Sequence, residues 1–208
     1  LLFQGCLAVV LAIAWTIVYG RHFFGHSAVV SSSGHQLFVS LITAEAVMIA
    51  LMYGAQTRVV LTSPYVIPSE PFLGAMCSAA RRGVTVDLIV DAESNKPLVQ
   101  YAQQSFYDTM LKAGVNIHRH HGSFLHAKHM SVDADVALIG SSNLDIRSFA
   151  LNAEVSVLIY DRSAVADLVR VQDDYLRHCD TVTREERRAL PLARRALENL
   201  ARLTDSLL

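Results

Sequence analysis

Apolar residues recur along this chain with two periods, one typical of buried strands and one typical of helices that cover a sheet. Three short runs rich in β-branched and apolar residues predict strands: residues 57–62, 84–90 and 115–120. Between the first two runs, Ser69 can cap a helix that Gly83 ends in the left-handed conformation. Between the second and third, Pro97 can begin a helix that ends at Gly114. This order predicts consecutive β-α-β units.

The second half of the chain continues with shorter elements. Residues 128–132 and 136–139 are predicted strands, and the polar residues 133–135 between them predict a tight turn that makes a hairpin. The remaining elements are a last strand and two helices, at residues 154–160, 163–178 and 191–207. Such alternation predicts an α/β fold with a mixed β-sheet flanked by helices on both faces.

The N-terminal part of the chain is the most apolar. Residues 6–19 are apolar over a length shorter than a typical membrane span, and residues 21–35 are rich in Gly, Ser and His, as in a connector. Residues 37–53 carry apolar side chains at helical spacing and predict an amphipathic helix. Because the chain begins with Leu, we expect a fragment in which residues 1–28 remain from a preceding domain and residues 29–208 form the domain proper.

Composition narrows the classes of partner. The formal net charge of -1 over 208 residues provides no general field for a polyanion, so we expect no nucleic-acid partner. Three widely spaced cysteines suggest neither a disulfide framework nor a zinc site. His118, His120 and His121 cluster beside one predicted strand, but no Cys or carboxylate completes a ligand set, so we expect no metal. The apolar fraction of 52% is high and favours contact with a membrane surface.

One group of residues carries chemistry. His126 and Lys128 are two apart on a predicted strand, so both side chains are expected on the same face of the sheet. An imidazole can attack phosphorus or move a proton, while an ammonium stabilises charge on phosphate oxygens. Asp133 follows, and residues 140–143 (Gly-Ser-Ser-Asn) can surround a phosphate with hydroxyl, amide and main-chain donors. The joint pattern indicates a phosphodiester substrate.

This spacing, H-x-K-x4-D-x6-G-S-x-N, resembles the phospholipase D superfamily, whose members react through a phosphohistidine without a metal or other cofactor. Residues 140–149 and 151–155 resemble the second motif of bacterial cardiolipin synthases, and residues 62–68 and 198–203 resemble other segments of those enzymes. The resemblance implies a phospholipase D-like catalytic domain over residues 29–208. It also implies a phosphatidyltransferase of the bacterial inner membrane that makes cardiolipin from two phosphatidylglycerol molecules.

The resemblance further implies roles for individual residues. His126 would be one of two catalytic histidines, while Lys128 and Asn143 would contact the phosphate. Asp133 would support the motif. Glu154, expected on the neighbouring strand, would hold a ring nitrogen of His126 and fix its tautomer; the alternative is a surface carboxylate.

Ser141 and Tyr65 complete the predicted site. Ser141 would add a hydroxyl to the groups around the phosphate. Tyr65 follows a predicted strand at the edge where α/β crevices open, so it would line the route of the substrate or else be a core tyrosine.

A complete cardiolipin synthase has two such motifs, and this sequence has one. The missing first half, or a second copy of the chain in a homodimer, would then supply the other histidine. With the other histidine as nucleophile, His126 would be the general acid and base. We therefore expect the chain to supply half of an active site that acts on phosphatidylglycerol at a membrane surface.

Three other functions fit the same motif. A phospholipase D that hydrolyses phospholipids needs the same histidine and lysine. A single-motif dimeric nuclease would be of similar size, although the near-neutral charge disfavours it. A scaffold without turnover would retain the fold, but the intact motif disfavours decay in this half.

Overall fold

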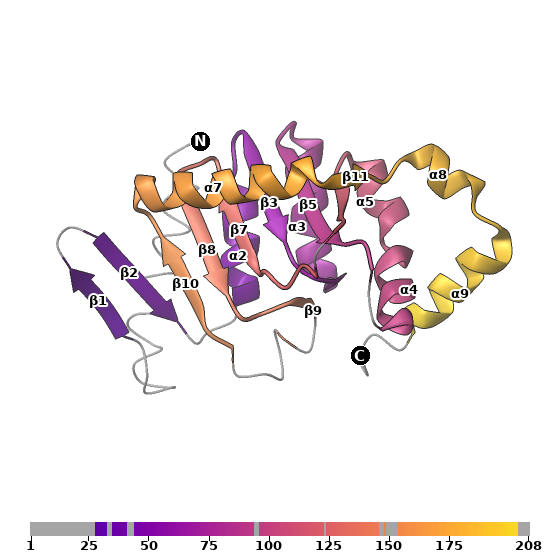
Figure 1. The fold of residues 1–208 in the computed structure, drawn as a ribbon, viewed down its shortest axis with the longest axis horizontal. Helices are drawn as coiled ribbons and strands as arrows, with labels where there is room; N and C mark the ends of the chain where they lie inside the picture. The colour runs from indigo at the N-terminus through magenta and orange to yellow at the C-terminus, as the bar shows by residue number, and fades with distance from the viewer. Residues whose placement is uncertain are drawn as a thin grey trace.

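A computed structural model describes residues 28–32, 35–40, 44–93, 96–122, 124–145, 148 and 154–203, with side chains described from residue 44 onward (Figure 1). The strands are β1 (Ala28–Ser32), β2 (His35–Ser40), β3 (Arg58–Thr62), β4 (Val66–Ile67), β5 (Thr85–Asp91), β6 (Asn116–His120), β7 (His129–Val132), β8 (Val136–Gly140), β9 (Leu144–Asp145), β10 (Ser156–Ile159) and β11 (Cys179–Thr181). The helices are α2 (Ala44–Gly54), α3 (Glu70–Arg81), α4 (Pro97–Ser105), α5 (Tyr107–Ala113), α7 (Arg162–Arg177), α8 (Arg184–Ala189) and α9 (Leu192–Arg202). Nine strands form one sheet in the order β1-β2-β10-β8-β7-β3-β5-β6-β11, and β4 pairs with β9.

Three central strands, β3, β5 and β6, run parallel. Helix α3 connects β3 to β5, and α4 with α5 connects β5 to β6. Ser69 caps α3 by accepting a hydrogen bond from the amide of Phe72 at 3.2 Å. Gly114 ends α5 in the left-handed region at φ 99°. The other neighbouring pairs in this sheet are antiparallel, so the predicted mixed sheet and β-α-β units are confirmed.

Alternate residues of the central strands face opposite layers of helices. Val59 and Leu61 lie in the main core, which also contains buried residues of α2, α3 and α5. Val60 and Ile89 point to the other face, where Tyr175 of α7 packs against them. Figure 1 shows α7 lying across the front of the sheet, with α2 and α3 behind it. The predicted helices on both faces are therefore confirmed.

The predictions for the N-terminal part need correction. Strand β1 lies within the predicted connector, and β2 takes the beginning of the helix predicted at 37–53, which starts only at Ala44. The cause is strand pairing: β2 is the antiparallel neighbour of β10, with Val39 opposite Val157, and such pairing overrides a local helical period. The apolar segment at residues 6–19 lies outside the described residues.

Other boundaries also differ from the predictions. The helix predicted over residues 97–113 is divided at Phe106 into α4 and α5. The strand at 154–160 was predicted to be the last one, but the short strand β11 follows it. Strand β11 pairs with β6, and no alternation of apolar residues indicated it. Helix α8 was not predicted, and within the described residues the helix expected over 191–207 is α9.

The β7–β8 hairpin brings the motif to one edge of the sheet. Asp133 and Ala134 turn the chain with positive φ values of 53° and 57°, as in a type I′ turn. Because β7 runs antiparallel to β3, the residues just before β7 lie at the edge where β3, β5 and β6 end. Crevices form at this edge in open α/β sheets.

Candidate active site

His126 and Lys128 lie just before β7 rather than on it, which corrects the prediction that both are strand residues. The side chain of His126 is exposed, and that of Lys128 is half-buried. The Lys128 ammonium donates a hydrogen bond to the carbonyl oxygen of His126 at 3.0 Å. The lysine head group is therefore held beside the histidine by a main-chain contact instead of by strand alternation.

The Lys128 ammonium is partly desolvated. Burial lowers its pKa below the ordinary value, and the nearby Glu154 carboxylate opposes that shift. The carbonyl oxygen of Lys128 accepts a hydrogen bond from the amide of Gly140 at 3.0 Å, which ties this segment to the end of β8. An ammonium with less water around it attracts an incoming phosphate more strongly than a fully solvated one.

Ser141 and Glu154 contact each other beside the motif. The Ser141 hydroxyl donates a hydrogen bond to the Glu154 carboxylate and accepts one from the amide of Val155 at 3.1 Å. Glu154 precedes β10 and is not part of a strand. Among the side chains that the structure describes, no hydrogen bond joins Glu154 to the ring of His126. The predicted role of Glu154 in orienting the imidazole stays a prediction.

Gly140 allows β8 to approach the chain that leads into β10. A Cβ at this position would lie 2.5 Å from Ser156 Oγ and 2.8 Å from the carbonyl oxygen of Val155. Real Cβ atoms do not approach backbone so closely, so only glycine fits here. The motif glycine brings Ser141 within reach of Glu154.

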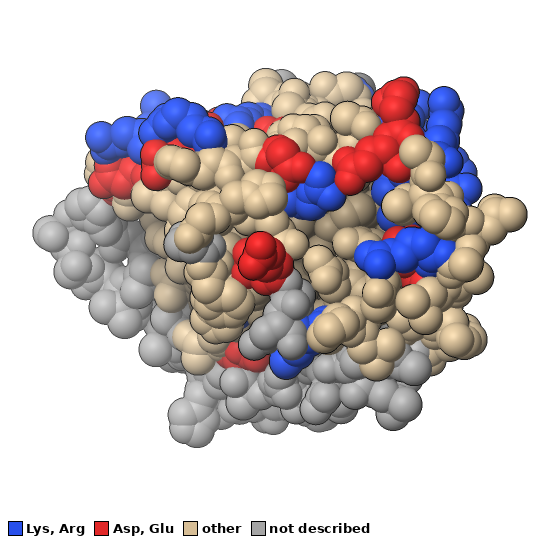
Figure 2. Space-filling model, turned by 45° about the vertical axis from the view of Figure 1, so that its right-hand side comes forward, with Lys and Arg blue, Asp and Glu red and all other residues tan. Residues whose placement is uncertain are grey.

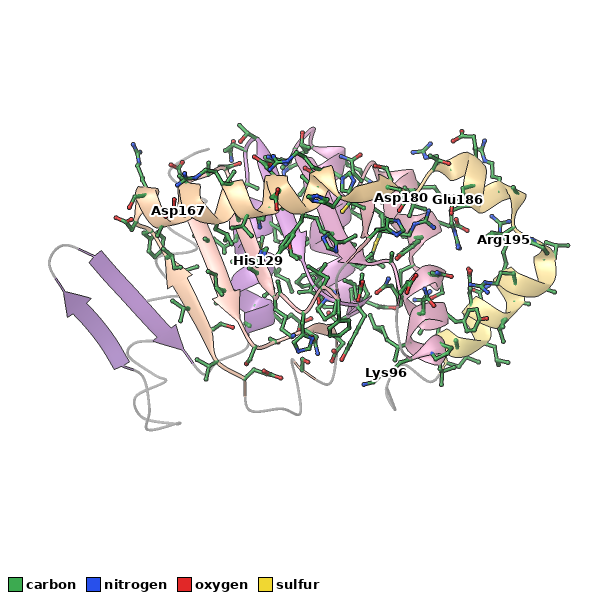
Figure 3. All side chains as sticks on the ribbon, in the orientation of Figure 1. Lys96, His129, Asp167, Asp180, Glu186 and Arg195 are labelled. Atoms are coloured by element: carbon green, nitrogen blue, oxygen red, sulfur yellow. The ribbon has the colours of Figure 1, made fainter. Side chains whose placement is uncertain are left out.

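Asn143 and Tyr65 form a second contact at this edge. The Asn143 amide nitrogen donates a hydrogen bond to the Tyr65 hydroxyl at 3.1 Å, and the Asn143 Oδ1 atom is buried without a partner among the described residues. The ammonium of Lys96 lies 5.8 Å from the centre of the Tyr65 ring, within reach of a cation–π contact. Figure 3 labels Lys96 near the start of α4. Sequence reasoning missed this lysine; its only signal was its place before the helix-initiating Pro97.

Asp133 lies at the other end of β7. Its carboxylate accepts hydrogen bonds from the amides of Gln56 at 2.8 Å, Thr57 at 2.8 Å and Arg58 at 2.9 Å. Partial burial raises the pKa of Asp133, but these hydrogen bonds outweigh it and hold the pKa below its usual value. At about 3.3 Å per residue of extended chain, Asp133 is about 23 Å along the chain from His126. It anchors the hairpin and does not reach the reacting groups.

A buried polar cluster behind the motif holds β7 against α7. Gln172 of α7 is fully buried, contacts Nδ1 of His129 at 3.1 Å and accepts a hydrogen bond from Ser131 at 2.6 Å. Burial lowers the pKa of His129 to about 4, so this imidazole is neutral at pH 7. Figure 3 shows His129 below α7, over the sheet. Sequence reasoning missed Gln172, because one glutamine on an amphipathic helix does not reveal a buried partner.

The three clustered histidines have other surroundings. His118 Nε2 lies 3.2 Å from the buried carboxylate of Asp87, and His121 Nε2 lies 2.5 Å from Asp180. His120 is buried. Across the described ranges, no group of three or more His, Cys, Asp or Glu side chains is arranged to hold a metal ion.

Comparison with known protein families and sequences gives a consistent result. The family model of the phospholipase D-like domain of cardiolipin synthase matches residues 48–175. Cardiolipin synthase A of Yersinia pseudotuberculosis serotype O:1b (strain IP 31758) is 34% identical over 209 residues, which cover 93% of this chain and 43% of that protein. Cardiolipin synthase A of Yersinia pestis bv. Antiqua (strain Angola) matches to the same extent. The chain thus spans less than half the length of these curated relatives.

Solved structures share the fold. A phospholipase D family member, Nuc from Salmonella typhimurium, superposes with a TM-score of 0.60 at 17% identity, covering 70% of this chain and 98% of that one. Phosphatidylserine synthase of Haemophilus influenzae Rd KW20 also gives a TM-score of 0.60, at 20% identity, covering 82% of this chain and 47% of that one. At these identities the likeness concerns the fold alone.

Proposed function

Because this chain belongs to the cardiolipin synthase family of phospholipase D-like domains, we propose that it supplies one half of the active site of a phosphatidyltransferase. The proposed reaction moves the phosphatidyl group of one phosphatidylglycerol onto a second one, giving cardiolipin and glycerol. The names of the relatives support a transferase: cardiolipin synthase A by sequence, and, more distantly, phosphatidylserine synthase by fold.

The proposed mechanism uses two histidines. One attacks phosphorus, and His126 protonates the departing glycerol oxygen, leaving a phosphohistidine. In the second step the acceptor hydroxyl attacks phosphorus, its proton passes to His126, and the bond from phosphorus to the nucleophilic nitrogen breaks. The Lys128 ammonium and the amide of Asn143 stabilise the non-bridging oxygens as charge develops. Ser141 would add its hydroxyl to these phosphate contacts.

The observation that carries this proposal is the arrangement at one sheet edge. There the exposed imidazole of His126 lies beside a partly desolvated ammonium, with an amide and a hydroxyl on the loop that follows β8. The Phe124 ring, which is 64% exposed, stacks on the His126 ring with 5.4 Å between centres. An exposed aromatic ring on an exposed catalytic group suits a site that a second half covers. That half is the missing first motif or a second copy of the chain.

The reaction can be tested on the full-length protein. With vesicles of phosphatidylglycerol as substrate, we expect cardiolipin and glycerol as products. His126→Asn should remove turnover and leave the folded structure intact, because the side chain is exposed. His178→Asn, at another exposed histidine, is the matched control and should retain activity. Phosphatidic acid without cardiolipin would indicate a hydrolase instead, and full activity in His126→Asn would refute the role of His126.

A separate assay with the same variants addresses nucleic acid as a substrate. On the face drawn in Figure 2, basic and acidic side chains are interspersed over the described residues, without a continuous basic band. Together with the net charge of -1, this arrangement disfavours a polyanion as substrate. Nicking of plasmid DNA that is lost in His126→Asn would instead support a nuclease.

We also propose that the chain works at a membrane surface, which α9 supports. No helix among the described residues is long and apolar enough to cross a membrane. The outward side of α9 and the residue that follows it nevertheless expose four leucines to solvent: Leu192, Leu197, Leu200 and Leu203. Arg194 and Arg195 of α9 are turned inward, where they pair with Glu198 and Asp108. The exposed leucines therefore carry this proposal, because apolar side chains on the outside of a helix suit insertion into a bilayer surface.

A further inference from the structure

A polar pocket opens at the ends of β5 and β6, beside the motif. Its volume is about 320 Å³, which is on the order of ten water molecules at about 30 Å³ each. The residues that line it come from the ends of the two strands and the loop after β6: Asp91, Ala92, Glu93, His120, His121, Gly122 and Phe124. None of these side chains belongs to the predicted site.

The pocket shares a wall with the catalytic histidine. Phe124 lines the pocket, and its ring is stacked on that of His126 with an angle of 20° between the planes. Burial raises the pKa of Asp91, and backbone hydrogen bonds from Glu93 and Leu125 partly oppose that shift. The Leu125 contact places the end of β5 beside the segment that carries the motif. A molecule in the pocket would therefore lie next to the reacting phosphorus.

The lining of the pocket selects the kind of molecule that fits. Asp91 and Glu93, at and just after the end of β5, contribute carboxylates, and His120 and His121, at and just after the end of β6, contribute imidazoles. Among the residues that the structure describes, no lysine or arginine lines the pocket, and its two carboxylates would repel an anionic phosphate. The two carboxylates accept hydrogen bonds, while a neutral imidazole both donates and accepts one. This lining suits a neutral molecule with several hydroxyl groups, because a hydroxyl both donates and accepts, whereas an ammonium group only donates.

Two lining residues have unused hydrogen-bonding capacity. Asp91 is 8% exposed and His120 is 5% exposed, and the Asp91 Oδ2 and His120 Nδ1 atoms have no partner in the structure among the described residues. Buried polar atoms are normally paired, so an unpaired one calls for a partner, either water or a bound molecule. Asp91 and His120 are register partners on the neighbouring strands β5 and β6, and two such residues lining one pocket indicate a built binding site.

We propose that this pocket binds the acceptor of the second reaction step as a small neutral polyol, the glycerol headgroup of a lipid or free glycerol. This inference rests on the proposed function. A hydroxyl oxygen of the bound polyol forms the new bond to phosphorus, the bond from phosphorus to histidine breaks, and the hydroxyl proton passes to His126. Holding the polyol here raises its local concentration above that of competing water. The pocket thereby directs the phosphohistidine towards transfer and away from hydrolysis.

The test measures how the intermediate divides between acceptors. The full-length protein is given vesicles of phosphatidylglycerol and deuterated free glycerol, and mass spectrometry follows deuterated phosphatidylglycerol, cardiolipin and phosphatidic acid. Glu93→Gln and Asp91→Asn keep the shape of the side chain but weaken hydrogen bonding to hydroxyl donors. In each variant we expect the ratio of transfer to hydrolysis to fall about tenfold, the loss expected for one hydrogen bond to a charged group.

The matched control is Glu185→Gln, an exposed glutamate on α8, which should leave the ratio unchanged. A fall in the deuterated product identifies free polyol as the occupant, and a fall in cardiolipin identifies the lipid headgroup; either supports the proposal. The proposal is overturned if both pocket variants leave the ratio of transfer to hydrolysis unchanged. It is also overturned if transfer and hydrolysis products fall by the same factor, which would indicate a merely structural role. It is also overturned if the wild-type protein transfers to ethanolamine in preference to glycerol. Absence of all products would instead contradict the proposed function.

Discussion

At the scale of single residues, the motif divides into groups that face the substrate and one group that does not. The carboxylate of Asp133 accepts hydrogen bonds from the three amides at residues 56–58 and also from the Thr57 hydroxyl. These contacts join the turn of the hairpin to the chain that leads into β3. The spacing of the motif therefore reflects the length of β7 as much as the chemistry at its beginning.

Replacing Asp133 by Ala should lower stability more than it lowers the chemical rate of folded molecules. Loss of a carboxylate that accepts backbone amides costs about 2 kcal/mol. Urea denaturation should show this loss, whereas Asp135→Ala, at an exposed residue of the same turn, should change the unfolding free energy by less than about 0.5 kcal/mol. Unchanged stability in Asp133→Ala would contradict the anchoring role.

His129 should make stability depend on pH. Its pKa is lowered to about 4 in the folded chain because the imidazole is buried, while an unfolded histidine titrates near 6.5. Between these values the unfolded state binds more protons, so stability is full above about pH 6.5 and falls as the pH drops towards 4, by roughly 3 kcal/mol in total. Urea denaturation at pH 7 and pH 4.5 should show a smaller difference in His129→Gln than in the unchanged chain. Equal pH dependence in both would refute this assignment.

At the scale of elements, the close approach of β8 and β10 depends on one glycine. In Gly140→Ala the new methyl would meet the Val155 carbonyl oxygen, and backbone cannot move aside as a flexible side chain can. We expect a loss of about 1 to 3 kcal/mol from overpacking, together with reduced activity as the contact between Ser141 and Glu154 opens. Gly74→Ala on α3, where a Cβ would meet nothing within 4 Å, is the control and should be neutral or stabilising. Thermal unfolding and activity of both variants in the full-length protein provide the measurement.

Elements with strong local signals could be predicted from the sequence, and those that depend on distant partners could not. The central strands were recognisable from β-branched runs, and α3 from its cap at Ser69. The strand β2 was hidden because apolar residues at helical spacing run across it, while its pairing partner β10 lies more than a hundred residues later. The three-residue strand β11 exists only through its pairing with β6.

In the candidate site, the sequence likewise reveals the local motif but not the contacts between distant residues. The motif located His126 and Lys128, although they precede β7 and their contact runs through the His126 carbonyl oxygen. The contact between Asn143 and Tyr65 joins residues 78 positions apart. That contact depends on how the loop after β8 packs against the loop after β3, which no local pattern reports. The roles of Glu154, Ser141 and Tyr65 in the reaction remain predictions.

At the scale of the whole molecule, α9 presents its faces in an unusual way. Its charged side is turned inward, where Glu198 is 1% exposed and is paired with Arg187 at 2.7 Å. Arg194 lies over the ring of Tyr101 of α4, 4.2 Å from its centre. Figure 1 places α9 at the end of the molecule, beside α4. Its leucines remain on the outside, although burial of a leucine is worth about 1.5 to 3 kcal/mol.

If these leucines insert into a bilayer, the double variant Leu192→Ser with Leu200→Ser should bind vesicles that contain phosphatidylglycerol at least tenfold more weakly. Co-sedimentation of the chain with such vesicles measures this. Tyr53→Ser with Val171→Ser removes two exposed apolar side chains from other helices and should bind as the unchanged chain does. Unaltered binding together with a changed molecular mass in solution would show that the leucines form a protein interface instead.

The separation of the two ends of β7 has a consequence for how such proteins diverge. A duplicated copy of the domain that no longer takes part in the reaction is free to lose His126 and Lys128, whose side chains make few contacts within the fold. It is not free to lose Asp133, because the hairpin would then separate from the chain before β3. Inactive descendants should therefore keep the aspartate after the histidine has been replaced. A domain that has this aspartate but lacks the histidine and lysine would then have evolved from an active enzyme.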